Sequence, residues 1–263
     1  MFDFTLNTSP KITQVNIGVG QTPLLIIDDF ANNPDDIIAF AGDGSLFKAS
    51  INNFYPGKRL LTPKNYSEAL CRKYSALLQK TFVLTIFGEE TCYKTIFDIN
   101  ADSVATTIMS ALAISDLPPE QLKPIQMLPH IDTTQINQLA VVHYLCGKEH
   151  GGTSFYQHKS TGFETITEQR LTQYSTQLKQ QAIQARLHKN PRYMAGSNSL
   201  FEQTYKVEAK INRAIIYPSN LLHSGNINPL LGLSSVPSEG RLTIGSFITF
   251  CSTNETNNAG GCG

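Results

Sequence analysis

The sequence predicts an α+β protein built on a double-stranded β-helix, or jelly-roll, core. Helical patterns come early in the chain, and many short strand-like runs separated by turn residues follow them. With 21 basic and 21 acidic residues and a hydrophobic fraction of 41%, the chain also has the composition of an ordinary folded protein. We expect one jelly-roll domain over residues 1–253, with α/β support over about 1–115, and a flexible tail over 254–263.

The N-terminal support is expected to contain a strand and two helices packed outside the core. The apolar run at 24–30 indicates a buried strand. Asn33 and Pro34 are typical of a helix start, and this helix ends near Ala41. The Pro-Gly pair within 55–59 predicts a turn. Apolar residues at helical spacing then predict a core-facing helix at 63–81.

The core strands are predicted from β-branched and apolar runs. We expect them at 93–99, 104–113, 125–132, 138–146, 153–157, 201–209, 213–217 and 242–250. The pattern Thr165-x-x-Glu168 is a capping box, which predicts an inserted helix over 165–188 on the outside of the barrel.

Charge and cysteine content exclude several classes of partner. The formal net charge is zero, so no overall field attracts nucleic acid or an anionic membrane. The basic clusters Lys58-Arg59, Arg72-Lys73 and 179–189 are interpreted as solvated faces. No apolar run reaches the roughly 20 residues needed to cross a bilayer. Five scattered cysteines without a CxxC pair, and no signal peptide, predict a reducing, cytoplasmic location.

The motif His130-x-Asp132 is the first candidate for chemistry. On an extended strand, residues two apart share a face, so an imidazole and a carboxylate would lie side by side. They form two thirds of the facial triad that holds non-haem Fe(II). A hydrogen-bonded His-Asp pair is the alternative. His223, which is 223 − 132 = 91 residues later and follows a strand, is the best third ligand. The weaker candidates are His143, His150, His158 and His188.

Arg241 and Thr243 open the last predicted strand and share one face. A guanidinium fork with a neighbouring hydroxyl can bind a carboxylate in two-point fashion, which a lysine cannot reproduce. Taken alone, Arg241 is equally well explained as a surface arginine at a strand start.

Several motifs occur in the order found in a known family. They are Ile26-Ile27-Asp28-Asp29-Phe30, Pro129-His130-x-Asp132, Tyr144-Leu145, Gly151-Gly152-x-x-Phe155, His223-x-Gly225 and Arg241-x-Thr243. With them the chain resembles the prolyl-4-hydroxylase-like Fe(II)/2-oxoglutarate-dependent dioxygenases, and more closely an uncharacterised bacterial branch of that superfamily. The resemblance spans residues 24 to 250 and is most specific from residue 129 onward.

This resemblance implies a role for each matching residue. His130, Asp132 and His223 would bind iron. Arg241, assisted by Thr243, would pair with a carboxylate of 2-oxoglutarate, the co-substrate used with O2. Tyr144 would contact the same carboxylate, unless the strand register turns His143 inward instead. Because related halogenases lack the aspartate, the presence of Asp132 favours hydroxylation.

Two departures from the family leave the substrate open. The spacing between His223 and Arg241 is 241 − 223 = 18 residues, longer than usual, so 226–239 is expected to be an inserted loop. That loop and the helix at 165–188 could form a substrate lid. A peptidyl residue, an amino acid and a small molecule all remain possible substrates, and the oligomeric state is not determined.

Two other classes of protein fit the same residues. A cupin-like hydrolase or isomerase would use the three ligands with zinc or manganese and would not need the arginine. A non-catalytic jelly-roll binding module could also retain the barrel and its histidines.

Overall fold

The structure, a computed structural model, describes residues 2–49, 55–82 and 103–252. The strand expected at 93–99 and the tail expected at 254–263 lie outside these residues.

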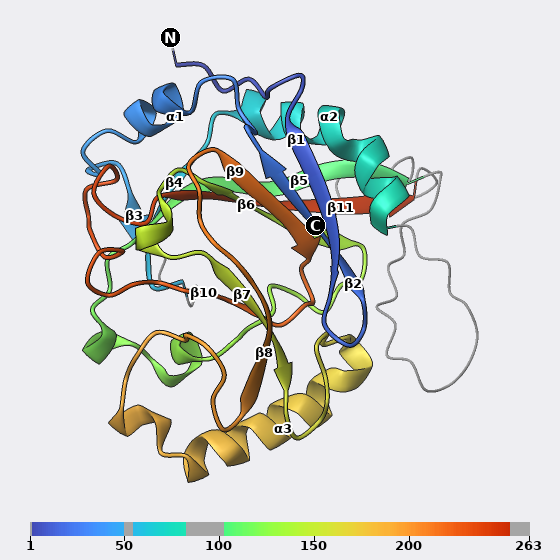
Figure 1. Cartoon of the computed structure of the whole chain (residues 1–263), viewed down its shortest axis with the longest axis vertical. Coiled ribbons are helices and arrows are strands. Elements are labelled where there is room, and N and C mark those ends of the chain that lie inside the picture. Colours follow the sequence, from blue (N-terminus) through green and yellow to red (C-terminus); the bar gives the residue numbers. More distant parts are fainter. Residues whose placement is uncertain (1, 50–54, 83–102, 253–263) are drawn as a thin grey trace.

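The described chain contains three α-helices and eleven strands (Figure 1). The N-terminal elements are β1 (Lys11–Ile17), β2 (Thr22–Asp28), α1 (Pro34–Ala41), β3 (Lys48–Ala49), β4 (Gly57–Leu61) and α2 (Lys64–Phe82). After them come β5 (Ser103–Ser115), β6 (Gln138–Tyr144), β7 (Thr153–His158), α3 (Glu168–Gln184), β8 (Phe201–Val207), β9 (Arg213–Pro218), β10 (His223–Gly225) and β11 (Thr243–Ser252). Short 3-10 helices lie at Pro119–Gln121, Pro124–Met127, Lys148–His150 and Leu187–Lys189.

The strands form two antiparallel sheets. The large sheet has the order β1-β2-β9-β6-β11-β5-β4-β3, and the small sheet has the order β10-β7-β8. In Figure 1, α1 and α2 lie on the side of the large sheet away from the small one, and α3 lies at the opposite end of the molecule. Mostly antiparallel strands with helices packed around them agree with the predicted α+β class.

Each face of the large sheet covers a different core. The outer core packs α1 and α2 against one face, with Tyr66, Leu70 and Leu78 of α2 fully buried beside Leu112 and Ile244. The inner core fills the space between the two sheets; it is made of Ile17, Leu24, Ala140, Tyr144, Cys146, Phe155, Val207, Ala209, Ile215, Tyr217 and Leu221. Side chains alternate between faces along a strand, so each strand residue belongs to one core or to the other.

The two N-terminal helices match the sequence prediction. The Asn33 side chain accepts a hydrogen bond from the Asp36 amide at 3.3 Å and caps α1, while Pro34 occupies its first turn. Gly42, with φ +59°, ends this helix. Helix α2 buries the predicted apolar stripe, including Tyr74.

Two predicted elements were wrong, the predicted inserted helix is present as α3 but begins later than its expected capping box, and β1 was not predicted. Residues 125–132 do not form a strand, because a 3-10 helix occupies Pro124–Met127 and only His130 makes a β-bridge. The turn expected at 55–59 gives way at Gly57 to β4, which pairs with β5. Helix α3 begins after Thr167, since Thr165 instead accepts hydrogen bonds from Arg170. Strand β1 is almost wholly exposed, so it lacks a clear hydrophobic pattern.

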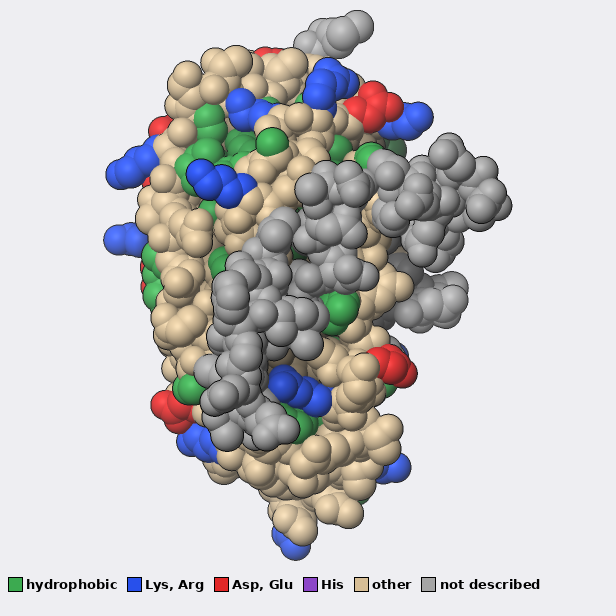
Figure 2. Space-filling view, turned by 90° about the vertical axis from the view of Figure 1, so that its right-hand side faces the viewer, with side chains coloured by type: hydrophobic (Ala, Val, Ile, Leu, Met, Phe, Trp, Pro, Cys, Tyr) green, Lys and Arg blue, Asp and Glu red, His purple; other side chains and the backbone are tan. Residues whose placement is uncertain are grey.

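The surface carries no dominant charge on the face shown in Figure 2, where basic and acidic side chains are scattered among uncharged ones. Among the described helices, none combines the length and the apolar character that crossing a bilayer requires.

Candidate metal centre

Backbone hydrogen bonds bring His130, Asp132 and His223 together although they are distant in sequence. The amide of each histidine donates to the carbonyl of the other, at 2.8 and 2.9 Å, so His130 is paired with the first residue of β10. The Asp132 amide donates to the Ser219 carbonyl at 2.8 Å, in the turn between β9 and β10. The predicted triad thus converges because one extended segment lies along the edge of the small sheet.

The three side chains point at a common place. One potential ligand atom from each lies within 4.8 Å of the others. The Asp132 carboxylate is 3.6 Å from Nε2 of His223 and 4.0 Å from Nε2 of His130. Two donors that bind one ion at about 2.1 Å lie at most about 4.2 Å apart. Both measured separations therefore fit a shared divalent cation.

The tautomer of His223 is fixed by a backbone carbonyl two residues earlier in the chain. Its Nδ1 lies 2.8 Å from the carbonyl oxygen of Leu221, which can only accept, so Nδ1 carries the proton. Nε2 is then left with a lone pair directed at Asp132, which is the form that binds a metal. The ring packs against Tyr217, with centroids 4.8 Å apart, so the imidazole is held in place on both sides.

Electrostatics make this cluster a site for a cation. Burial raises the pKa of Asp132 to about 6, against the opposing effects of His130 and Arg59. Burial lowers the pKa of His223 to about 4, and burial with repulsion from His223 lowers that of His130. The His130 side chain remains half exposed, so the cluster is open to solvent on that side. No Lys or Arg among the described residues pairs with Asp132, so a metal ion would supply the missing positive charge.

Arg241 lies in the same interior, 5% exposed. Its Nε and Nη2 donate to the carbonyls of Gly151 and Gly152, each at 3.2 Å. Nη1 donates to no described residue, and no described carboxylate pairs with the guanidinium. A Cβ placed on Gly225 would lie 3.5 Å from Nη2, so the guanidinium lies beside the strand that begins with His223. It is therefore a buried cation positioned for an anion that the described chain does not supply.

The register of β6 settles which side chain faces this interior. Tyr144 is fully buried in the inner core and pairs directly with Thr243. Its hydroxyl donates to Thr153 at 2.6 Å, and its ring lies 5.8 Å from the Arg241 guanidinium. Burial raises the pKa of Tyr144 to about 12, against the effect of Arg241, so the hydroxyl keeps its proton.

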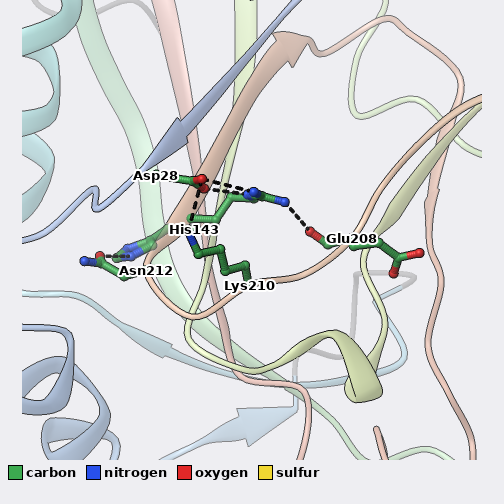
Figure 3. Close-up of polar contacts among 6 residues, drawn as sticks. Asp28, His143, Glu208, Lys210 and Asn212 are labelled. Atoms are coloured by element: carbon green, nitrogen blue, oxygen red, sulfur yellow. Dashed lines mark hydrogen bonds and ion pairs between the residues drawn. The ribbon is translucent and has the colours of Figure 1, made fainter. Parts of the chain in front are cut away.

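The neighbouring His143 lies in the outer core. Its Nδ1 is 3.2 Å from the Tyr66 hydroxyl. Its Nε2 is 3.1 Å from the Asn212 side-chain oxygen, as Figure 3 shows. The alternative in which His143 faces the pocket is therefore wrong. Two further histidines are also engaged elsewhere: His150 with the Leu231 carbonyl, and His158 with Thr161 and Gln181.

Sequence reasoning missed three features of the site. The ring of Tyr217 packs on His223, and the carbonyls of Gly151 and Gly152 hold Arg241. Arg59 was assigned to a solvated face, yet its charge acts on Asp132 and His130. The glycine pair was visible as a turn, but nothing local to residue 59 indicates its proximity to residue 132.

Both inserted segments are held by hydrogen bonds to other parts of the described chain, and the helix is held close to a candidate ligand. The 226–239 segment is held by backbone hydrogen bonds from Ser234 to Ser115 and from Asn228 to His150. At the start of α3, Glu168 accepts a hydrogen bond from Thr134, two residues after Asp132. That either segment opens and closes as a substrate lid remains a prediction.

Solved structures include chains that are similar over most of this chain at low sequence identity. HygX from Streptomyces hygroscopicus, with nickel and 2-oxoglutarate bound, is 11% identical, with 87% of this chain and 83% of that chain covered and a TM-score of 0.42. EvdMO1 is 13% identical, with 91% and 55% covered and a TM-score of 0.39. TqaL, described as an Fe(II)/(alpha)ketoglutarate-dependent dioxygenase, is 11% identical, with 82% and 77% covered and a TM-score of 0.30.

Of these three, the TqaL description names the class that the sequence motifs resemble. At these identities and TM-scores, the likeness does not assign that class to this chain. No curated protein matches the chain. A family model does match it, over residues 8–248. The chain therefore belongs to the family of unknown function DUF6445.

Proposed function

We propose that this protein is an Fe(II)- and 2-oxoglutarate-dependent dioxygenase that hydroxylates a small molecule, an amino acid or a peptidyl group. His130, Asp132 and His223 would be the iron ligands, and Arg241, Thr243 and Tyr144 would bind the distal carboxylate of 2-oxoglutarate. The scattered cysteines support a cytoplasmic location.

One observation carries the proposal: a two-histidine, one-carboxylate cluster shares its interior with a buried arginine that has no acidic partner among the described residues. Gly225, beside the guanidinium, is two residues past His223, and two residues of a strand span roughly 6.8 Å. A five-carbon dicarboxylate can reach from one group to the other. A zinc or manganese hydrolase of the cupin type would have no use for this arginine.

The strand order supports a double-stranded β-helix. From β5 onward the chain alternates between the sheets: β5, β6, β9 and β11 lie together in the large sheet, and β7, β8 and β10 form the small one. The His130 segment, bridged to β10, takes the place of an eighth strand. Eight strands in two facing sheets are the arrangement of a jelly roll.

When bound, iron, 2-oxoglutarate and O2 would supply an oxidative decarboxylation whose product is the oxidant for hydroxylation. The residues of this chain orient and enclose that chemistry. Leu221 fixes the His223 ring, the glycine carbonyls fix the Arg241 fork, and the inner-core aromatic residues exclude water on one side.

The test is an anaerobic titration of the protein with Fe(II) and 2-oxoglutarate. We expect a weak visible charge-transfer band that His130→Ala abolishes, because that change removes one of three ligands. His150→Ala is the matched control, since His150 bonds to a loop carbonyl and not to the cluster. A protein that gives no band, and no thermal shift with either ligand, would not be an enzyme of this class. Release of succinate and carbon dioxide distinguishes it from a binding module.

A further inference from the structure

One row of side chains crosses the inner face of the large sheet from edge to centre. Arg59 of β4 is paired with Ala113 of β5, Ala113 with Thr243 of β11, and Thr243 with Tyr144 of β6. Directly paired residues of antiparallel strands project from the same face. Since Tyr144 belongs to the inner core, Arg59 projects toward the inner side too. The neighbouring Leu60 packs on the outer core, as this alternation requires.

Arg59 has no acidic partner among the described residues. Its half-buried guanidinium lies over the ring of Tyr55, 4.9 Å from the centroid, and donates no hydrogen bond to a described residue. A cation–π contact of this kind does not use the hydrogen-bond acceptors that a guanidinium normally engages, so its N–H groups remain available for a planar anion. Arg213 shows the contrast, because Asp28 engages its Nε at 2.6 Å and its Nη2 at 3.1 Å; Figure 3 shows this carboxylate, which Lys210 also contacts.

This open guanidinium lies on the same face of the large sheet as Thr243 and Tyr144, the proposed co-substrate residues, and it makes no ion pair with Asp132. Along the row, only the methyl group of Ala113 separates it from Thr243, two strand spacings or roughly 10 Å away. One row further in, no described atom lies within 4 Å of a Cβ placed on Gly245. Small residues therefore line this face between Arg59 and the centre of the sheet.

The charges of the proposed complex balance without Arg59. The charge of a ferrous ion and that of Arg241 would be offset by the Asp132 carboxylate and the two carboxylates of 2-oxoglutarate. Arg59 is then a surplus positive charge near the ligand set, and a further anion would neutralise it. Lys48, paired with Arg59 on the edge strand, adds a second positive charge.

We propose that Arg59 binds an oxyanion, a carboxylate or a phosphate, on the primary substrate and holds that substrate beside the metal ligands. This inference rests on the proposed function and narrows it. It favours an acidic small molecule or a free amino acid over a neutral residue inside a peptide. Arg59 is then a specificity-determining residue, distinct from the co-substrate clamp at Arg241.

The test uses the full chain loaded with Mn(II) and 2-oxoglutarate, with carbon-13-labelled acetate and inorganic phosphate as probes. Mn(II) shortens the relaxation times of nuclei held near it, so each probe reports its own binding near the ligand set. We expect saturable relaxation enhancement with at least one probe. Enhancement with acetate alone would identify a carboxylate substrate, and enhancement with phosphate alone a phosphorylated one.

Three variants isolate the contribution of Arg59. Arg59→Gln should weaken probe binding by about tenfold or more, the size of a lost charge-assisted contact, while the protein still binds Mn(II) and keeps its 2-oxoglutarate affinity. Arg59→Lys keeps the charge without the fork and should give an intermediate loss. Lys58→Gln is the matched control, because Lys58 projects from the opposite face and pairs with Asp116 at 2.7 Å. Its probe binding should equal that of the unmodified protein.

The outcomes against the inference are distinct from those against the proposed function. Equal probe relaxation in Arg59→Gln and the unmodified protein would overturn the role of Arg59, as would no enhancement in a protein that binds Mn(II) and 2-oxoglutarate. Loss of 2-oxoglutarate binding in Arg59→Gln would assign Arg59 to the co-substrate instead. If the unmodified protein fails to bind Mn(II), which the water-proton relaxation reports, the proposed function itself fails.

Discussion

At the scale of single residues, the candidate site depends on polar side chains with some nitrogen atoms already hydrogen-bonded and others still available. In His223, Nδ1 donates to a backbone carbonyl, and Nε2 remains available for a metal ion. In Arg241, Nε and one N–H of Nη2 donate to carbonyls, while Nη1 and the second N–H of Nη2 remain available for a carboxylate. In each case the backbone fixes the direction of the side chain, and the remaining atom is the one that chemistry can use.

The two-point contact proposed for the Arg241 guanidinium can be tested by a substitution that keeps the positive charge. Arg241→Lys should weaken 2-oxoglutarate binding by roughly 10- to 100-fold, because an ammonium group cannot make the two-point contact that contributes about 1.5–3 kcal/mol. Metal affinity should stay the same, since Arg241 touches no member of the ligand set. Isothermal titration calorimetry with Fe(II)-loaded, oxygen-free protein measures both. An unchanged 2-oxoglutarate affinity would remove Arg241 from the co-substrate site.

At the scale of elements, the turn before β7 links the clamp to the barrel. The carbonyls of Gly151 and Gly152 both point at Arg241. Gly151 has φ +96°, and a Cβ there would collide with the carbonyl oxygen of Asn226. A side chain is therefore excluded twice, by backbone conformation and by space. The Gly-Gly pair is a structural requirement for placing the guanidinium.

A pair of glycine substitutions separates these two effects. Gly162, with φ +72°, has no described atom within 4 Å of its Cβ position, so Gly162→Ala should cost only the roughly 1–2 kcal/mol of the left-handed backbone. Gly151→Ala should cost more than about 3 kcal/mol, since the collision adds to the same backbone term. Urea unfolding measures both free energies. Equal losses would mean that the turn relaxes freely around the new side chain.

At the scale of the whole molecule, the large sheet separates a structural core from a functional one. The outer core buries the helices, whereas residues of the inner core contact the candidate site: Tyr217 packs on His223, and Tyr144 lies beside Arg241. His143 belongs to the outer core, where it joins α2 through Tyr66 to the β8–β9 turn through Asn212. Its neighbour Tyr144 belongs to the inner core. Of these two adjacent residues, His143 therefore contributes to packing and Tyr144 to the candidate site.

Because His143 is wholly buried, it should make the stability of the molecule depend on pH. Burial lowers its pKa from 6.5 to about 4, partly opposed by the Asn212 hydrogen bond. The unfolded chain then binds more protons than the folded one between these values, so stability falls as the pH drops from 6.5 toward 4. The expected loss from this residue between pH 7 and pH 5 is about 2 kcal/mol.

Urea unfolding at both pH values, on the unmodified protein and on His143→Gln, isolates this contribution. The glutamine does not titrate, so its variant should lose about 2 kcal/mol less on acidification. Other buried histidines contribute equally to both proteins and cancel in the comparison. The same pH dependence in both would show that His143 does not stay neutral in the folded state.

The sequence alone identified most of the elements and the six candidate site residues. Strands and helices were found where a face is buried, because burial imposes a period of two or of about 3.6 on the apolar residues. Strand β1 was not predicted because it is exposed, and an exposed strand has no periodic pattern of apolar residues. The motif spacing selected His130, Asp132 and His223 because two imidazoles and a carboxylate are the residue types that bind a divalent metal. The strand expected to carry the first two is mostly absent.

Only the tertiary structure decided which of these residues meet, and which neighbours they have. The choice between His143 and Tyr144 depended on strand register, and a shift of one residue would have exchanged their faces. The pairing of β4 with β5 brings Arg59 to the inner face, and the glycine carbonyls meet Arg241 although they lie about 90 residues from it in the chain. Such pairings are set by the packing of the whole sheet, so no local pattern around these residues records them.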